Sequence, residues 1–350
     1  MRTLDLGVVI LNWNGADDTL ACLESVYAAE RIPAHVVLVD NGSADDSVAR
    51  IVAWLESRPG FRRCSGTPSA GLTRWEVHPP AGAAPPERAA RFTLVEAGEN
   101  LGFARGNNVG LRHLLAEGWS HVALLNNDAV VGPDAFAVLL EAMEEHPAAQ
   151  AVVPQIRYVD PPDRIWSCGG EWTWFGSTWY HYGDRPAAEV RSREPFPVGF
   201  VTGCALVLRA AWLRAHGLLT ERFFFGEEDV ELSWRLRSEG RGTMLCVPAA
   251  VAHHRVGAST RRLADGSNAP RTHLQYLNRL VFLRSVWGRG PRWQLRRWVT
   301  AGYWGWLLLT RFGASLVESV RKARELAGEA ARCDEVGAAQ VRRIMGERRP

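Results

Sequence analysis

Four short apolar runs constrain the fold of this chain more than any other feature. Each is rich in Val, Leu and other apolar residues and stops abruptly at polar residues, and they occupy 6–11, 35–39, 92–96 and 121–125. Such runs are typical of strands buried on both faces of a parallel sheet. Helical patterns follow them, at 16–29, beyond Ser43 (a candidate N-cap), up to about 116 and at 133–145. This β-α-β-α order predicts an α/β fold with a mostly parallel sheet and right-handed crossovers.

Polar residues follow each of these runs. They are Asn12 and Asn14, Asp40 and Asn41, Asn100 and Asn107, and Asn126 and Asp128. Ligands of open α/β sheets bind beyond the carboxyl ends of the strands, so we expect these residues to converge on one pocket. The chain has no P-loop and no GxGxxG motif, but segment 100–106 leads into a helix whose first amides can face a phosphate. The pattern indicates a nucleotide pocket.

The triplet Asn126-Asn127-Asp128 ends the last of these runs. A carboxylate with amide oxygens beside it offers the hard ligands that Mg²⁺ or Mn²⁺ prefers. The alternative is a plain strand-to-helix turn, in which Asn127 or Asp128 starts the next helix. The triplet alone leaves both interpretations open.

Three further segments stand out. Residues 58–90 contain six prolines and many Gly and Ala, which predicts an irregular surface insertion. Residues 160–200 are rich in Trp, Tyr and Gly, which predicts short strands and loops. Within them, the flat aromatic faces of 166–182 can stack on sugar rings or lipid, and core packing is the alternative. Glu227-Glu228-Asp229 opens a helix, either as a functional acidic group or as a first turn favoured by the helix dipole. Glu231 and Arg235, at i and i+4, are expected to form an ion pair.

Charge is unevenly distributed along the chain. The net charge is only +3, but residues 271–350 hold 15 Arg and one Lys against six acidic groups, so residues 1–270 carry −7. Within 287–311 Arg and Trp alternate, and the apolar stretch between Arg297 and Arg311 is too short to span a bilayer. We expect an interfacial helix pair on an anionic membrane, with a soluble cap whose Trp side chains pack inward as the alternative. No nucleic-acid module accompanies these residues.

Composition and cysteines place the chain among ordinary globular proteins. Apolar residues make up 47% and charged residues 23% of the 350. The six scattered cysteines have no metal-ligand spacing, which favours a reduced, cytoplasmic compartment with each thiol buried. The first strand starts almost at the N-terminus, and we therefore expect no signal peptide.

Five motifs in order carry a family resemblance. They are Val-Val-Ile-Leu-Asn-Trp-Asn (8–14), Val-Asp-Asn-Gly-Ser (39–43), Asn-Leu-Gly-Phe-Ala-x-Gly-Asn-Asn (100–108), Leu-Leu-Asn-Asn-Asp (124–128) and Gly-Glu-Glu-Asp-Val-Glu-Leu-x-x-Arg (226–235). Together they resemble glycosyltransferase family 2, and within it the rhamnosyltransferase-like branch that builds bacterial polysaccharides. The resemblance covers roughly residues 6–285.

This resemblance implies a GT-A fold over residues 1–270, a Rossmann-like, mostly parallel sheet flanked by helices. Residues 271–350 form the basic, Trp-rich helical, membrane-interfacial tail. The implied catalytic residues are Asp229, as the base, and Glu228. The implied metal ligands for Mg²⁺ or Mn²⁺ are Asp128, with Asn126 replacing the usual first carboxylate, and His253, although adjacent His254 leaves that register open. The implied nucleotide-sugar residues are Asn12, Asp40 (for the nucleobase), Asn41, Asn100, Gly102, Phe103, Asn107, Asn126, Asn127 and Gly203.

The expected activity is inverting, metal-dependent transfer of a sugar, with rhamnose from dTDP-rhamnose favoured, to a lipid-linked glycan in cell-wall or polysaccharide biosynthesis. The protein is expected to be peripheral on the cytoplasmic face of the cell membrane. Two alternatives remain: a sugar-phosphate nucleotidyltransferase, disfavoured because no Gly-rich triphosphate loop follows the first strand, and a catalytically silent, membrane-tethered GT-A module.

Overall fold

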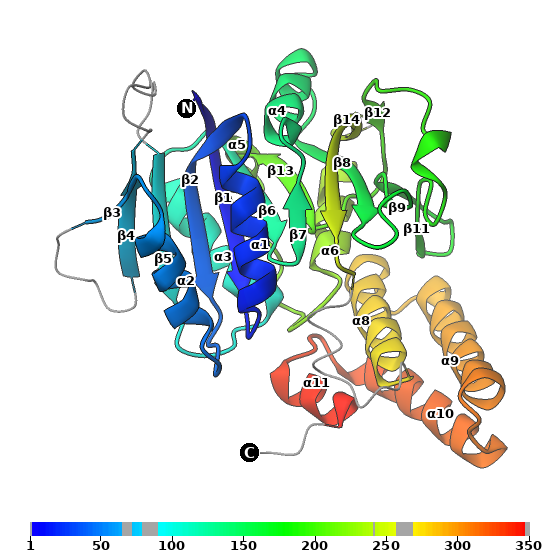
Figure 1. Cartoon of the computed structure of the whole chain (residues 1–350). Coiled ribbons are helices and arrows are strands. Elements are labelled where there is room, and N and C mark those ends of the chain that lie inside the picture. The colour runs from blue at the N-terminus through cyan, green and yellow to red at the C-terminus, as the bar shows by residue number, and fades with distance from the viewer. Residues whose placement is uncertain (1, 65–71, 79–89, 241, 257–268, 347–350) are drawn as a thin grey trace.

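The computed structural model describes residues 2–64, 72–78, 90–240, 242–256 and 269–346. The body is a large sheet covered by helices on both faces (Figure 1). Its centre consists of the parallel strands β6 (His121–Asn126), β1 (Arg2–Asn12), β2 (Arg31–Asp40) and β5 (Ala90–Glu96), adjacent in that order. The α/β fold predicted from the four apolar runs is confirmed.

Side chains of the central strands alternate between two apolar cores, because successive residues of a strand point to opposite faces. Val8 and Ile10 of β1 face the core under α1 (Ala16–Tyr27), α2 (Ser47–Ser57) and α4 (Ala135–Glu145). Val9 faces the other core, under α3 (Phe103–Ala116) and α5 (Ala210–His216). Helix α3 lies very close to β1, and a Cβ added at Gly110 would stand 2.5 Å from a methyl carbon of Val9.

The second half of the sheet is mixed. Strand β13 (Ala205–Arg209) runs antiparallel to both β6 and β8 (Ala151–Tyr158), and β14 (Met244–His254) runs parallel to β8. The short β7 (Ala129–Val131) follows β6 and pairs antiparallel with the end of β14. Since β7 rather than a helix follows Asp128, the plain strand-to-helix turn considered for this triplet is wrong.

The predicted irregular insertion is partly ordered. Strands β3 (Phe61–Arg63) and β4 (Leu72–Val77) extend the sheet beyond β5 in antiparallel pairing. Trp75 is 1% exposed and packs edge-on against Phe92, which explains why this Pro-rich region still adds a strand. Residues 65–71 and 79–89 of the insertion lie outside the described residues.

The aromatic region 160–200 forms short strands and loops, as expected. It contains β9 (Ile165–Ser167), the hairpin of β10 (Gly170–Trp172) and β11 (Thr178–Tyr180), a 3₁₀ turn (Ala187–Glu189) and β12 (Phe196–Pro197). Four of the six cysteines are buried as predicted, whereas Cys64 is exposed and Cys333 is partly exposed.

The described part of the C-terminal region is helical. Its helices are α8 (Ala269–Trp287), α9 (Pro291–Arg311), α10 (Leu316–Arg332) and α11 (Ala338–Met345), which lie together beside the β8–β14 side of the sheet (Figure 1). They build a third apolar core, which also takes in Phe200, Phe223 and Val230 from the body. The chain after α10 is tied to the body through backbone bonds of Val336, with the Phe224 amide donating to its carbonyl at 2.8 Å. Within the described ranges no helix has the length and apolarity to cross a bilayer.

The close packing of α3 on β1 makes a stability prediction. Gly110→Ala should lower the free energy of unfolding by about 1–3 kcal/mol, because the new methyl group overpacks the Val9 contact. Gly302→Ala in α9 is the matched control, since nothing lies within 4 Å of its added Cβ and alanine favours helix. Urea denaturation followed by circular dichroism measures both. A urea midpoint of Gly110→Ala that equals or exceeds the midpoint of Gly302→Ala would contradict the packing at Gly110.

Candidate functional site

A cleft opens at the carboxyl ends of β1, β2 and β6, where the sequence pattern predicted a pocket. It encloses about 1000 Å³, part of it open to solvent. The predicted residues that line it are Asn41, Asn100, Gly102, Phe103, Asn126, Asn127 and Asp128. Amide and carboxylate groups line this cleft together with apolar side chains, a combination that is typical of ligand-binding sites.

One wall of the cleft is a loop fastened by asparagine side chains. The side-chain amide group of Asn41 donates to the Asn100 side-chain oxygen at 3.0 Å and to the Gly102 carbonyl at 3.2 Å. Its side-chain oxygen accepts from the Leu101 backbone amide. Gly102 has φ +83°, and a Cβ there would lie 2.3 Å from the Phe224 carbonyl oxygen. Only glycine fits this position, where the loop enters α3.

Asn12 and Asp40 lie behind the cleft wall and do not line it. The Asn12 amide donates to Asp40 at 2.8 Å, and Ser43 donates to the Asp40 carboxylate through its hydroxyl at 2.6 Å and its amide at 3.0 Å. Asn127 extends this network through Thr19. The prediction that Ser43 caps α2 is wrong, because Ser43 bonds to Asp40 and α2 starts at Ser47 without a side-chain cap. Asn107 is also buried, and it donates to the Phe103 carbonyl within α3.

Asp128 meets a histidine inside the cleft. The pairing of β7 with β14 brings His254 Nε2 to 3.1 Å from Asp128 Oδ1, and both side chains are nearly buried. The neighbouring His253 points to the other face of β14, so the expected placement of His253 beside Asp128 is corrected to His254. Burial alone lowers the pKa of His254, but the Cys204 sulfur and the Asp128 carboxylate raise it to about 10. Trp166 packs edge-on against the His254 ring at 4.6 Å.

The acidic triplet lies at the start of α6 (Glu228–Arg237). Glu227 is left-handed, with φ +74°, and its carboxylate pairs with Arg279 at 2.5 Å. Burial, and then the neighbouring Asp229 carboxylate, raise the pKa of Glu228 to about 8. Burial and then Glu227 raise the pKa of Asp229 to about 6, while the Gly203 amide donates to its carboxylate at 3.3 Å. The three acids are therefore not a mere solvent-exposed first turn.

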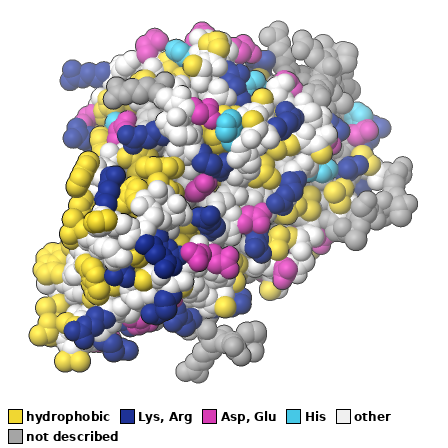
Figure 2. Space-filling model, turned by 180° about the vertical axis from the view of Figure 1, so that it is seen from behind, with side chains coloured by type: hydrophobic (Ala, Val, Ile, Leu, Met, Phe, Trp, Pro, Cys, Tyr) yellow, Lys and Arg dark blue, Asp and Glu magenta, His cyan; other side chains and the backbone are white. Residues whose placement is uncertain are grey.

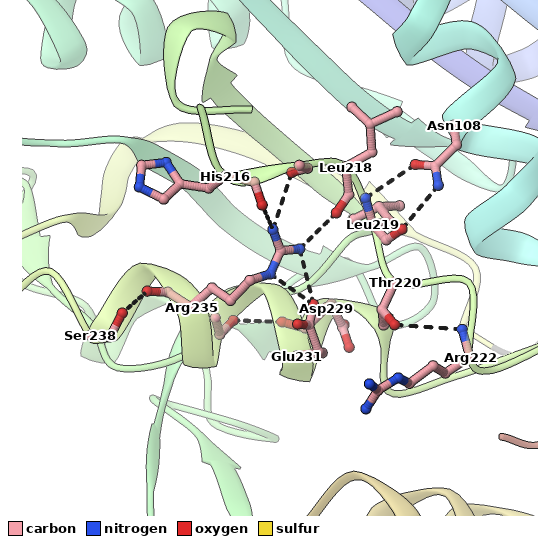
Figure 3. Close-up of polar contacts among 12 residues, drawn as sticks. Asn108, His216, Leu218, Leu219, Thr220, Arg222, Asp229, Glu231, Arg235 and Ser238 are labelled. Atoms are coloured by element: carbon pink, nitrogen blue, oxygen red, sulfur yellow. Dashed lines mark hydrogen bonds and ion pairs between the residues drawn. The ribbon is translucent and has the colours of Figure 1, made fainter. Parts of the chain in front are cut away.

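Helix α6 is held in place from behind by Arg235 (Figure 3). The expected ion pair with Glu231 is confirmed at 2.9 Å, and the same guanidinium donates to the carbonyls of His216, Gly217 and Leu218. These bonds satisfy carbonyls at the end of α5 and fix the segment that precedes α6.

The pair of Asp128 and His254 lies in the same region of the molecule as the acidic triplet 227–229. Both Asp128 and Asp229 act on the pKa of the buried Cys204 thiol, which burial raises first. The Gly203 amide donates to Asp229, and a Cβ added to Gly203 would lie 3.6 Å from the cleft-lining Phe103 and 3.8 Å from the Asp229 Cβ. Phe224 and Phe225 also line the cleft just before Gly226 and the triplet. Asp229 therefore lies close to the cleft wall, whereas Asp128 lines the cleft itself.

The cleft is also lined by residues that the sequence did not assign to the site, among them Trp166, Arg271 and Val341. Arg271, on α8, is the most notable, because burial lowers the pKa of its guanidinium and no described carboxylate forms an ion pair with it. Its only signal was its place at the start of the basic region. Val341 comes from α11, so the C-terminal region completes the cleft wall.

Comparisons with known proteins identify the family. A family model described as "Glycosyltransferase like family 2" matches residues 81–272, more than half of the chain. The chain belongs to glycosyltransferase family 2. This glycosyltransferase is 28% identical over 316 residues to N-acetylglucosaminyl-diphospho-decaprenol L-rhamnosyltransferase of Mycobacterium tuberculosis. The match covers 83% of this chain and 89% of that protein.

Solved structures confirm the GT-A fold of the glycosyltransferase. GalNAc-T7, solved with UDP, GalNAc and Mn²⁺, has a TM-score of 0.55 at 15% identity, and the match covers 98% of this chain and 56% of that longer protein. Mannosyltransferase PcManGT of Pyrobaculum calidifontis, solved with GDP-Man and Mn²⁺, has a TM-score of 0.51 at 14% identity and coverages of 98% and 78%. At these identities the likeness concerns the fold alone.

The raised pKa of Asp229 predicts how transfer depends on pH. The family resemblance implies that Asp229 is the base, and a base must be deprotonated to act. On that assignment kcat/KM should rise with pH through an apparent pKa near 6. Glu227→Gln removes a charge that raises this pKa and should move the rising limb to lower pH. The exposed Glu76→Gln variant on β4 serves as the control and should leave the limb in place. If the rising limb of kcat/KM in Glu227→Gln lay at the same pH as in the unmodified protein, the electrostatic coupling between Glu227 and Asp229 would be contradicted.

Proposed function

We propose that this glycosyltransferase is an inverting, metal-dependent enzyme. It moves a hexose, with rhamnose from dTDP-rhamnose favoured, to a lipid-linked glycan. The observation that carries the proposal is proximity: Asp128 and His254 line the cleft together, and both Asp128 and Asp229 are near enough to the buried Cys204 thiol for their charges to act on it. The rhamnosyl specificity is taken from the mycobacterial relative, whose name contains a diphospho-decaprenol acceptor.

The cleft offers complementary surfaces for a nucleoside diphosphate. Leu11, Trp13 and Asn41 line its part nearest β1 and β2 and would hold the nucleoside, with Asp40 and Asn12 fixing that wall from behind. The guanidinium of Arg271, with which no described carboxylate forms an ion pair, would bind the diphosphate.

The residues present fit a divalent cation. A carboxylate oxygen of Asp128 and Nε2 of His254 lie 3.1 Å apart in the cleft. Once a cation displaces the proton that the two groups share, they form a donor set compatible with Mn²⁺ or Mg²⁺. The other ring nitrogen of His254 is buried and has no hydrogen-bond partner in the described structure. When bound, such an ion supplies charge neutralisation for the departing diphosphate.

Asp229 is placed to act as the base. Its carboxylate takes the proton of the acceptor hydroxyl while that oxygen forms a bond to the anomeric carbon. On the opposite side the bond from this carbon to the donor phosphate oxygen breaks, and its electron pair leaves with the nucleoside diphosphate. Attack and departure on opposite sides invert the anomeric centre. Glu228, whose raised pKa keeps it largely protonated at neutral pH, limits the negative charge beside the base.

The acceptor's lipid implies a place at the membrane. We propose that the protein works as a peripheral protein on the cytoplasmic face of the cell membrane, with the basic C-terminal region toward anionic lipid.

The role of Asp229 can be tested by one substitution. Asp229→Asn should lower kcat by about 10²–10⁴-fold, the usual contribution of a positioned base, because an amide cannot accept the proton. Donor binding, measured by isothermal titration with dTDP and Mn²⁺, should change little. Glu141→Gln, an exposed carboxylate on α4, is the control and should retain full activity. Undiminished transfer by Asp229→Asn would exclude it as the base, and absence of transfer by the unmodified protein would favour a silent module.

A further inference from the structure

Helix α9 has two apolar faces, and only one of them is covered. Trp293, Trp304 and Leu308 are buried in the third core. Opposite them, at helical spacing, lies a second row that remains 42–55% exposed: Leu295, Trp298, Val299, Tyr303, Trp306 and Leu309. A soluble helical cap would have a polar outer face, so this row calls for a partner.

The exposed row continues onto neighbouring elements. Leu316, Val317 and Val320 at the start of α10 are 43–79% exposed, and Trp174 at the tip of the β10–β11 hairpin is 75% exposed. Arg292 joins this tip to α9, since it donates to the Trp174 carbonyl at 2.7 Å and lies 5.4 Å from the Trp174 ring centroid. We call the outer row of α9, the start of α10 and the hairpin tip the aromatic face. Hydrophobic side chains gather with Arg and Lys on this edge of the molecule (Figure 2).

The charges around the aromatic face identify the partner. Arg292, Arg296 and Arg297 donate only to neutral oxygens, of Trp174, Ser177 and Ala327, and none of the described carboxylates pairs with them. Arg297 also lies over the Trp298 ring at 4.9 Å. Tryptophan and tyrosine beside unpaired arginines suit the headgroup layer of an anionic bilayer. A second copy of the chain fits less well, because a two-fold contact would bring these like charges together.

The hairpin connects the aromatic face with the reaction centre. At its base Tyr180 lies near Asp229, whose charge helps to raise the pKa of the buried tyrosine, after burial itself. Arg279, the partner of Glu227, donates to Gly176 and Thr178 of the same hairpin. Trp174 and Tyr180 are six positions apart, which is at most about 20 Å of extended chain. A lipid headgroup at a bilayer surface that contacts Trp174 therefore lies within reach of the region around Asp229.

We propose that the aromatic face docks the enzyme on an anionic bilayer: its apolar side chains enter the interface, and Arg292, Arg296 and Arg297 bind lipid phosphates. Docking turns the hairpin and the acceptor side of the cleft toward the membrane, so that a lipid-anchored acceptor reaches Asp229 without leaving the bilayer. This inference rests on the proposed function for the identity of the acceptor, whereas docking itself depends only on the surface.

Vesicle flotation of the full chain tests the proposal. The protein should float with phosphatidylcholine vesicles that contain phosphatidylglycerol, and much less with phosphatidylcholine alone or at high salt. The double variant Trp298→Ser/Trp306→Ser should reduce the vesicle-bound fraction at least tenfold. Arg292→Gln/Arg296→Gln should remove the preference for phosphatidylglycerol.

Matched controls separate this surface from general effects. Trp179→Ser, an exposed tryptophan on the face of the hairpin that points away from Trp172, and Arg62→Gln on β3 should float like the unmodified protein. Transfer to a detergent-solubilised acceptor should persist in the Trp298/Trp306 variant, so loss of docking is distinguished from loss of catalysis. Flotation unaffected by both double variants would overturn the proposal. So would a dimer, seen by light scattering, that the tryptophan variant converts to monomer.

Discussion

The contact between Asp128 and His254 determines how the active-site cleft is assembled. These residues are 126 positions apart, and only the antiparallel pairing of three-residue β7 with the end of β14 brings them to 3.1 Å. The pairing turns the chain back immediately after β6, so that the carboxylate projects into the cleft and does not start a helix. Trp166, which also lines the cleft, packs on the same histidine. The remaining wall is then built around this point.

The acidic triplet depends on a different constraint, which is burial balanced by a few positive or donor groups. Glu227, Glu228 and Asp229 are adjacent, and their burial would be costly without Arg279 and the Gly203 amide. Arg279 belongs to α8, and Arg271 and Val341 of the C-terminal helices line the cleft. The C-terminal region therefore completes the cleft wall and also carries the aromatic face.

Local pattern was sufficient to predict much of this molecule. Continuous apolar runs fix β1, β2 and β6 because a strand buried on both faces must be apolar throughout. Of the polar residues at their ends, Asn41, Asn126 and Asp128 line the predicted cleft, whereas Asn12 and Asp40 support its wall. Features that depend on the pairing of distant strands were harder to predict from the sequence. A shift of one residue in a strand exchanges its faces, which is why His253 and His254 were not separable before β14 was seen paired.

The other differences between the sequence-based predictions and the structure also arise from contacts between residues far apart in the chain. Trp75 supplies enough buried surface to make a strand of a Pro-rich segment, which only its contact with Phe92 reveals. The tryptophans of the tail were expected to face either a membrane or the core, and α9 has both orientations, with Trp304 buried in the core and Trp306 exposed. Arg271 carries no local motif, and only the packing of α8 against the body brings it to the cleft.

The central claim is that Asp128 and His254 hold a cation, which in turn holds the diphosphate of a sugar donor. Thermal unfolding in the presence of Mn²⁺ and UDP-, GDP- or dTDP-sugars tests it most directly. Ligand at 100 times its Kd should stabilise the folded protein by about 2.7 kcal/mol. We expect this gain with the accepted donor only when Mn²⁺ is present, and we expect Asp128→Ala to abolish it. No stabilisation by any donor, or the same stabilisation with EDTA and in Asp128→Ala, would contradict the account.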